Sequence, residues 1–291
     1  MRKVGIFQIL ASGICFGSLG LFGKYAYSAG LTPGEILGLR FTTASLILFT
    51  YLIFTDRTKL KLKRTEVAAC LALGSLGYAV FSSFYFFALQ GLSASLTVLL
   101  LYQYPILVAI GAWFLFGEKI PTSRIWVFPL VLIGLVGLVW GEFVIEKKSA
   151  LIFGIGSAVF YSVYILASSR WLKNVSPLAS VALIQIAAGL TLSFLYIESL
   201  ERLMYLITHH WVLILCFAIV PSVFAMTLFN ASLQKLKTWE VSILGNAEPI
   251  SAILLAALFL GERPQPLQML GGIAVLLGLI ALAIPQKKTN S

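Results

Sequence analysis

Two stretches of this sequence begin and end alike: residues 105–118 read PILVAIGAWFLFGE and residues 249–262 read PISAILLAALFLGE. The two copies lie 144 residues apart, about half of the 291-residue chain. Working outward at the same offset, further positions match without a gap: Pro33 with Pro177, Gly134 with Gly278, Phe16 with Phe160, and Gln90 with Gln234. The sequence therefore predicts an internal repeat, with one unit over residues 1–144 and a second over residues 145–291.

The composition places both units in a membrane. The chain is 59% hydrophobic and 11% charged, whereas a soluble domain is roughly 45–50% apolar and about 25% charged. Apolar runs long enough to cross a hydrocarbon core of roughly 30 Å recur throughout, and they lack the alternation of barrel strands. We expect ten transmembrane helices, approximately over residues 4–28, 33–55, 66–89, 93–116, 124–141, 149–171, 176–198, 210–232, 239–260 and 266–284.

The number of helices in each unit fixes how the units are related. Because five is odd, the second unit enters the membrane from the opposite side, which predicts an all-α integral membrane protein of two inverted five-helix repeats. If the N-terminus is cytoplasmic, the inside loops hold fifteen Lys and Arg residues and the outside loops hold four. By the positive-inside rule, both termini face the cytoplasm of a cell (inner) membrane. The net charge of +10 then reflects topology, and no nucleic-acid partner is expected.

Motifs in both units resemble those of the EamA family of ten-helix transporters, within the drug/metabolite transporter superfamily. They are Phe16-Gly17, Lys24, Pro33 and Leu39-Arg40-Phe41 in the first unit, and Glu248-Pro249, Leu260-Gly261-Glu262-Arg263, Leu270-Gly271-Gly272 and Leu277-Gly278 in the second. The family often has Trp where this chain has Phe16. The resemblance implies transport of a small solute, often the export of amino acids or other metabolites, without naming the solute.

Aromatic and polar residues near the centres of the expected helices are candidates for a substrate-binding cavity. Tyr78 and Ser82 share one face of the third helix because they are four residues apart. An amide at the depth of Asn246 needs a partner. The substrate-binding candidates are Phe16, Tyr78, Ser82, Tyr102, Phe160, Tyr161, Tyr164 and Asn246. They predict a cavity with aromatic walls and few charges, although each aromatic residue could instead pack inside the bundle.

Glu248 is the acidic residue that we expect near the membrane midplane, where a charge costs roughly 2.5–3.5 kcal/mol. It is either a protonated carboxyl group bonded to a neighbouring helix or a proton-coupling site, and we predict proton coupling. Two residues turn a helix by about 200°, so Glu248 and Asn246 cannot both point squarely into one cavity. Snorkelling is the favoured interpretation of Lys24 and Arg40, and a positive rim that attracts anionic solutes is the alternative.

No catalytic, metal-binding or cofactor motif accompanies these features. The histidines His209 and His210 are adjacent at a segment end, and the three cysteines show no C-x-x-C spacing. We therefore expect no enzyme activity, no catalytic residues, no cofactor and no bound metal. The expected partners are a small-molecule substrate, the lipid bilayer, and protons as the candidate coupling ion.

Together these features predict a secondary-active transporter of a small organic solute. The favoured function is export of an amino acid or related metabolite by alternating access, because two inverted halves can exchange conformations around one central site. A non-transporting membrane scaffold or receptor that retains the fold is the alternative. A membrane enzyme is a third possibility, and the missing nucleophile–base pair argues against it.

Overall fold

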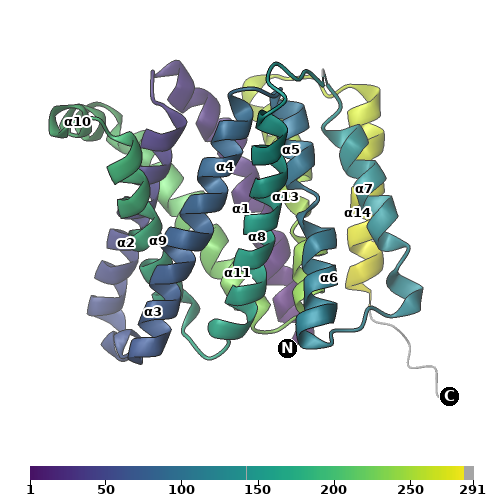
Figure 1. Ribbon diagram of the computed structural model, residues 1–291, viewed down its shortest axis with the longest axis horizontal. Coiled ribbons are helices and arrows are strands. Elements are labelled where there is room, and N and C mark those ends of the chain that lie inside the picture. The colour runs from purple at the N-terminus through teal and green to yellow at the C-terminus, as the bar shows by residue number, and fades with distance from the viewer. Residues whose placement is uncertain (142, 285–291) are drawn as a thin grey trace.

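The computed structural model describes residues 1–141 and 143–284, and this part of the chain forms a bundle of helices (Figure 1). Within it, nine helical segments are long and apolar enough to cross a membrane, and a shorter apolar helix over residues 122–138 makes ten. The prediction of an all-α membrane protein with ten transmembrane helices is confirmed. An isolated antiparallel bridge joins Leu92 to Ile145 in a connection between helices.

Several of the ten segments consist of more than one helical element. The first half contains α1 (Arg2–Ser28), α2 (Pro33–Thr55), η1 (Arg57–Leu60), α3 (Arg64–Ala72), η2 (Leu73–Tyr78), α4 (Ala79–Leu89), α5 (Ala94–Leu101), α6 (Tyr104–Phe116), η3 (Thr122–Arg124) and α7 (Val127–Leu138). The second half contains α8 (Ala150–Trp171), α9 (Pro177–Tyr196), α10 (Leu200–Phe217), η4 (Ala218–Phe224), α11 (Ala225–Leu233), α12 (Thr238–Leu244), α13 (Ala247–Leu260) and α14 (Pro266–Ala283).

The two halves run through the bundle in opposite directions. We call the face at which α1 begins the N-terminal face and the opposite one the far face. Arg2 marks the N-terminal face, where its side chain contacts the Glu240 carboxylate and the backbone oxygens of Leu282 and Ala283 at the end of α14. In contrast, α8 begins at the far face beside Gly91. Thus α1 leaves from one face and α8 from the other (Figure 1), as inverted repeats require.

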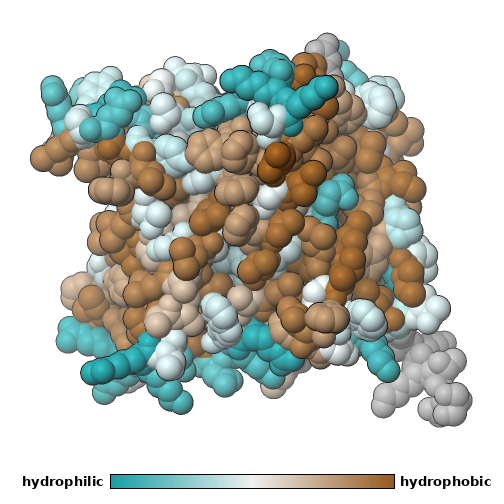
Figure 2. Space-filling view, viewed as in Figure 1, coloured by the Kyte–Doolittle hydropathy of each residue, from teal (hydrophilic) through white to brown (hydrophobic). Residues whose placement is uncertain are grey.

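The outer surface has the character of a membrane-embedded bundle. Figure 2 shows hydrophobic residues across the middle of the visible face and hydrophilic residues gathered along its upper and lower edges. Large apolar side chains such as Phe54, Phe114 and Phe194 are more than three-quarters exposed. An apolar belt of this kind would be unstable in water, so it is best explained by contact with lipid tails.

The first helix of each half packs mainly on the other half. Helix α1 lies against α11 and α13, and α8 lies against α4 and α6. Glycines permit the closest approaches: a Cβ atom at Gly17 would lie 2.6 Å from the Ser251 Cβ, and one at Gly271 would lie 2.3 Å from the Leu138 backbone nitrogen. Small residues allow such contacts in lipid, where dispersion rather than the hydrophobic effect holds helices together. This crossed packing joins the halves into one bundle.

The repeat extends to individual backbone angles. Gly117 ends α6 and Gly261 ends α13, and both adopt the left-handed conformation, with φ of 64° and 67°. In each turn the next residue returns a hydrogen bond to the helix, from Glu118 N to Ala112 O at 3.1 Å and from Glu262 N to Ala256 O at 3.4 Å. Glycine adopts this conformation without the steric penalty of a side chain.

Helix α10 departs from the predicted segments. We expected a loop before residue 210, but the helix begins at Leu200 and bends at His210, whose φ and ψ are −124° and 19°. The first part extends sideways from the bundle at the far face (Figure 1). Arg202 anchors it through bonds of 2.7 and 3.2 Å to the Glu35 carboxylate and one of 3.1 Å to Gly30 O. Its mixture of charged and exposed apolar residues is typical of a helix at the membrane interface.

Candidate functional site

Two broken helices meet near the centre of the bundle. The fourth segment is interrupted between α5 and α6 at Tyr102 and Gln103, and the ninth between α12 and α13 at Gly245 and Asn246. Proline is the second residue of α6 (Pro105) and the third of α13 (Pro249), and its missing N–H and bulky ring prevent the preceding helix from continuing through it. Broken helices at this depth are tolerated where they line a cavity. We therefore expect a cavity beside these two breaks.

A cavity of about 730 Å³ lies between the two halves. Its volume is within the range of pockets that hold small organic molecules. The residues at its entrance lie at the end of α1, the start of α2, the end of α13 and the start of α14: Lys24, Tyr27, Pro33, Glu262 and Gln268. All four of these helix ends belong to the far face, so the cavity opens there.

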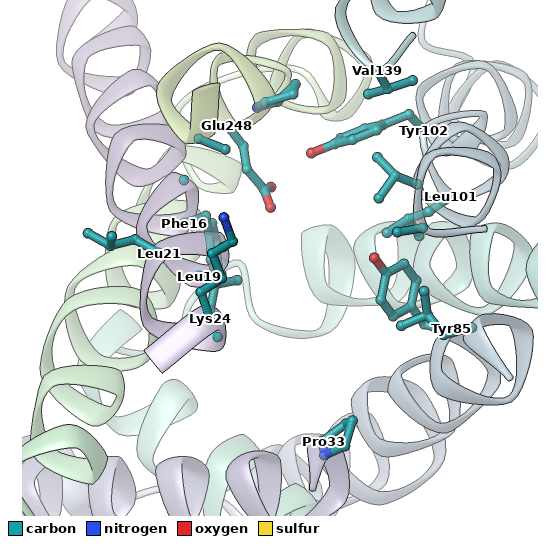
Figure 3. A pocket seen from close by; sticks show the side chains of 18 of the residues that line it. Phe16, Leu19, Leu21, Lys24, Pro33, Tyr85, Leu101, Tyr102, Val139 and Glu248 are labelled. Carbon is teal, nitrogen blue, oxygen red and sulfur yellow. The ribbon is translucent and has the colours of Figure 1, made fainter. Parts of the chain in front are cut away.

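Six of the nine site residues predicted from the sequence line this cavity: Phe16, Tyr78, Ser82, Tyr102, Tyr161 and Glu248. They come from both halves. Figure 3 shows the Glu248 carboxyl group and the phenol oxygens of Tyr85 and Tyr102 pointing into the same opening from opposite sides. The wall therefore combines aromatic rings with a carboxyl group and phenol oxygens.

Three other predicted residues do not reach the cavity. Tyr164 is 1% exposed and packs edge-on against Tyr78, while Phe160 packs against Phe84 with ring centroids 4.9 Å apart. Asn246 is fully buried, and its Nδ2 donates to Ser242 O at 3.2 Å and to Ile243 O at 2.8 Å. The side chain folds back onto α12, where the last carbonyl groups of the ending helix accept hydrogen bonds from it. The expectation that Asn246 faces the central space is therefore wrong in this conformation.

The favoured interpretation of Arg40, as a snorkelling residue, is also wrong. Snorkelling would carry its guanidinium to the membrane surface, but the residue is only 5% exposed and lines the cavity. The guanidinium carbon lies 4.4 Å from the centre of the Phe41 ring. Tyr85, which shares the helix face of Tyr78 and Ser82, lines the cavity as well, and so does Tyr104, which was not among the predicted site residues. The internal repeat indicates Tyr104 as a site residue, because Tyr104 lies 144 residues before Glu248 and is its equivalent in the first half.

Lys24 and Glu262 form an ion pair at the entrance. Both residues line the cavity, and they join the end of α1 to the end of α13. The pair is half exposed to solvent, so we expect a small contribution to stability. Its main effect is local, since it neutralises two of the four charged side chains in the cavity wall.

The opposite end of the cavity is closed. Tyr104 forms part of the floor, and its hydroxyl donates to Ser242 O at 3.1 Å. Farther toward the N-terminal face, the Glu118 carboxylate accepts hydrogen bonds from Thr238 N at 2.9 Å and Thr238 Oγ1 at 3.0 Å. This carboxylate links the end of α6 to the first residue of α12. These contacts join the two halves below the cavity.

A bundle of two inverted five-helix repeats, with broken helices beside a central cavity, is an architecture found in many transporter folds. The model of the EamA-like transporter family matches the chain twice, over residues 3–140 and 148–284. The chain therefore belongs to the EamA-like transporter family, and it is a multi-pass membrane protein.

Known relatives agree with this assignment. The uncharacterized transporter YxxF of Bacillus subtilis (strain 168) is 25% identical over 99% of this chain and 93% of that protein. YyaM, an uncharacterized transporter from the same organism, is 21% identical over 100% of this chain and 98% of that protein. A protein of known crystal structure has the same fold, with a TM-score of 0.82 at 18% identity over 97% of this chain and 96% of the other. The two Bacillus subtilis relatives support a general transporter role without naming a solute, and the solved structure shows the fold alone.

Proposed function

We propose that this protein is a secondary-active transporter that exports an amino acid or related metabolite by alternating access. The observation that carries the proposal is a cavity between two inverted halves, open at the far face and closed at the N-terminal face. If the halves exchange conformations, the same cavity opens to the other side. The positive-inside distribution of Lys and Arg supports an orientation with the N-terminal face in the cytoplasm of an inner membrane. In that orientation, the conformation described above is open to the outside.

Glu248 is the residue that we assign to proton coupling. It lies in the first turn of α13 beside the helix break and lines the cavity. A carboxyl group in such a place can take up a proton while the cavity is open to one side and release it after the halves rock. The matching position in the first half is Tyr104, so the proposed proton site belongs to the second half alone.

Gradient-driven transport in reconstituted vesicles tests the proposal. We expect the purified protein to accumulate at least one solute from a panel of labelled amino acids and other small metabolites when a pH gradient is imposed. Glu248→Gln keeps the shape of the side chain but cannot titrate. We expect this variant to lose gradient-driven accumulation while retaining solute exchange at saturating concentration. Glu201→Gln, at an exposed position of α10, is the matched control.

The outcomes separate the alternatives. If Glu248→Gln accumulates solute at the wild-type rate with the same pH dependence, Glu248 is structural and coupling lies elsewhere. If no member of the panel crosses the vesicle membrane under any gradient, whereas the protein is folded and correctly inserted, a scaffold or receptor role replaces the transport proposal.

A further inference from the structure

The first part of α10 exceeds what a membrane crossing requires. Its segment, Leu200–Leu233, has 34 residues, and a straight helix of that length is about 51 Å long, whereas the hydrocarbon core is roughly 30 Å thick. The bend at His210 removes the excess, because it turns residues 200–209 sideways at the far face (Figure 1). We call residues 200–209 the arm.

The arm carries an apolar stripe and a polar face. The members of the stripe lie four, three and four positions apart, so they share one face of a helix, and all are between 41% and 74% exposed. They are Leu200, Met204, Ile207 and Trp211, the last just beyond the bend. Glu201, Thr208 and His209 form the polar face and are exposed. Figure 2 shows the arm, at the upper left, hydrophilic on its upper side and hydrophobic beneath, so its apolar side faces the membrane.

Lipid is the partner that the apolar stripe fits. The stripe continues the apolar belt of the bundle at the level where hydrophilic residues begin (Figure 2). Trp211 is 57% exposed and Tyr205 is 47% exposed, and side chains of these two types gather at the level of lipid headgroups. A helix with one apolar and one polar face lies in the membrane interface with its apolar face against the acyl chains.

Charge does not explain the attachment of the arm. Interfacial helices commonly carry Lys and Arg residues that attract anionic lipids, but Arg202 is the only Lys or Arg in residues 196–212. Its guanidinium is already bound to the Glu35 carboxylate, and two acidic residues, Glu198 and Glu201, precede it. The burial of the apolar stripe must therefore supply the attraction.

A third face of the arm packs against the cavity entrance. Leu206 is fully buried in an apolar cluster that includes Ile36, and Ile36 lines the cavity. Arg202 Nε donates to the Glu35 carboxylate at 2.7 Å. The same carboxylate accepts a hydrogen bond of 2.8 Å from Thr32 N, at the cap of α2. The position of the arm is therefore tied to the first turn of α2.

We propose that the apolar stripe docks the arm on the lipid interface at the far face, and that this contact holds the first turn of α2 in place at the cavity entrance. Zwitterionic phospholipids suffice, because apolar burial rather than charge holds the arm. Neither contact involves a transported solute.

Site-directed spin labels test the lipid contact. In cysteine-free protein in phosphatidylcholine vesicles, a nitroxide is attached at Met204→Cys on the apolar stripe or at Thr208→Cys on the polar face. Oxygen concentrates among acyl chains, whereas a nickel chelate stays in water. We expect the ratio of oxygen to nickel accessibility to be at least about threefold higher at position 204 than at position 208. Adding phosphatidylglycerol should change this ratio by less than about twofold, because the only Arg of the arm is paired.

Three results would overturn the lipid contact. A label at position 204 that is as accessible to nickel as one at position 208 means that the arm lies in water. A label at position 204 that is shielded from both reagents means that a protein, such as a second copy of this chain, covers the stripe. A difference that appears only with phosphatidylglycerol means that charge holds the arm.

Hydrogen exchange tests the hold on α2. One variant makes the stripe polar through Leu200→Gln, Met204→Gln and Ile207→Gln. The matched control carries the same number of changes on the polar face: Glu201→Gln, Thr208→Gln and His209→Gln. In vesicles, the backbone amides of residues 30–36 should exchange about tenfold faster in the first variant than in the unmodified protein, and at an unchanged rate in the control.

Arg202→Gln separates the two contacts, and it carries the test if the first variant does not fold. It removes the bonds to Glu35 but leaves the stripe intact, so exchange over residues 30–36 should rise while a label at position 204 stays in lipid. Unchanged exchange in either folded variant would show that the arm does not hold α2. Neither measurement needs a solute or a gradient. Failure of transport in vesicles therefore leaves the arm in place, and failure of the arm leaves the transport proposal standing.

Discussion

Tyr102 and Asn246 occupy matching positions in the two halves, yet only Tyr102 lines the cavity. We expect Tyr102→Ala to raise the solute concentration for half-maximal transport by about tenfold, because it removes an aromatic contact and a phenol group. Asn246→Ala should leave that concentration unchanged and cost about 1 kcal/mol of stability, since it removes hydrogen bonds to carbonyl groups of α12. Transport assays and thermal unfolding check both. The opposite ranking would show that Asn246 reaches the solute in another conformation.

At the level of single residues, the sequence predicted how deep a residue lies in the membrane. It did not predict the direction in which the side chain points. Helical spacing places Tyr78 and Ser82 on one face, and both line the cavity. Asn246 was expected to point the same way, but the break after α12 changes the path of the backbone. Arg40 was assigned to the surface because its position near a helix end allowed snorkelling. The cavity beside it is formed by several helices, so no local sequence pattern indicates it.

Contacts between helices give a sharper prediction. A Cβ atom at Gly17 would lie 2.6 Å from the Ser251 Cβ and 2.8 Å from the Ala252 backbone nitrogen, whereas one at Gly20 would meet nothing within 4 Å. We expect Gly17→Ala to destabilise the protein by about 1–3 kcal/mol through overpacking of α1 against α13. Gly20→Ala, its control one turn later, should gain up to about 1 kcal/mol from helix propensity. Equal melting temperatures for the two variants would contradict this packing.

Hydropathy predicted the ten membrane-spanning segments. It did not predict where a segment departs from a straight α-helix. It gave ten segments, but it did not separate the lateral part of α10 from a loop, because Leu200 to His209 mixes charged and apolar residues. It also missed the π-helical turns η2 and η4, which stand at corresponding places in the two halves. These turns depend on packing and on Pro221 within η4 rather than on hydropathy.

For the whole molecule, the first prediction concerns orientation. The distribution of fifteen against four basic residues predicts that the connection over residues 56–64 lies in the cytoplasm. Single cysteines introduced there, after replacement of Cys15, Cys70 and Cys216, should react with a membrane-impermeant reagent only when the cytoplasmic side is accessible. Labelling in intact cells would reverse the orientation and, with it, the side to which the cavity opens.

Alternating access predicts a reciprocal exchange of contacts between the faces. Glu118 and Thr238 meet at the closed face, and the matching residues Glu262 and Ala94 both line the open cavity. In cysteine-free protein, a short bifunctional thiol reagent should join Glu118→Cys to Thr238→Cys in the present conformation, and Ala94→Cys to Glu262→Cys after the halves have exchanged. Fixing the first pair should prevent the second from reacting. If both pairs react together in one molecule, the reciprocal motion is wrong.

If the two halves alternate as proposed, the hydroxyl group of Thr238 should also influence the resting equilibrium. It donates to Glu118 at the closed face, but the corresponding residue at the other face is Ala94, which has no hydroxyl group. If closure of the far face repeats the same geometry, it forms one hydrogen bond fewer. A difference of about 1 kcal/mol favours the present conformation by roughly fivefold. If the protein is an exporter, the empty transporter would rest with its cavity open to the outside, where the solute is released. The conformational change that reopens the cavity to the cytoplasm would then limit turnover.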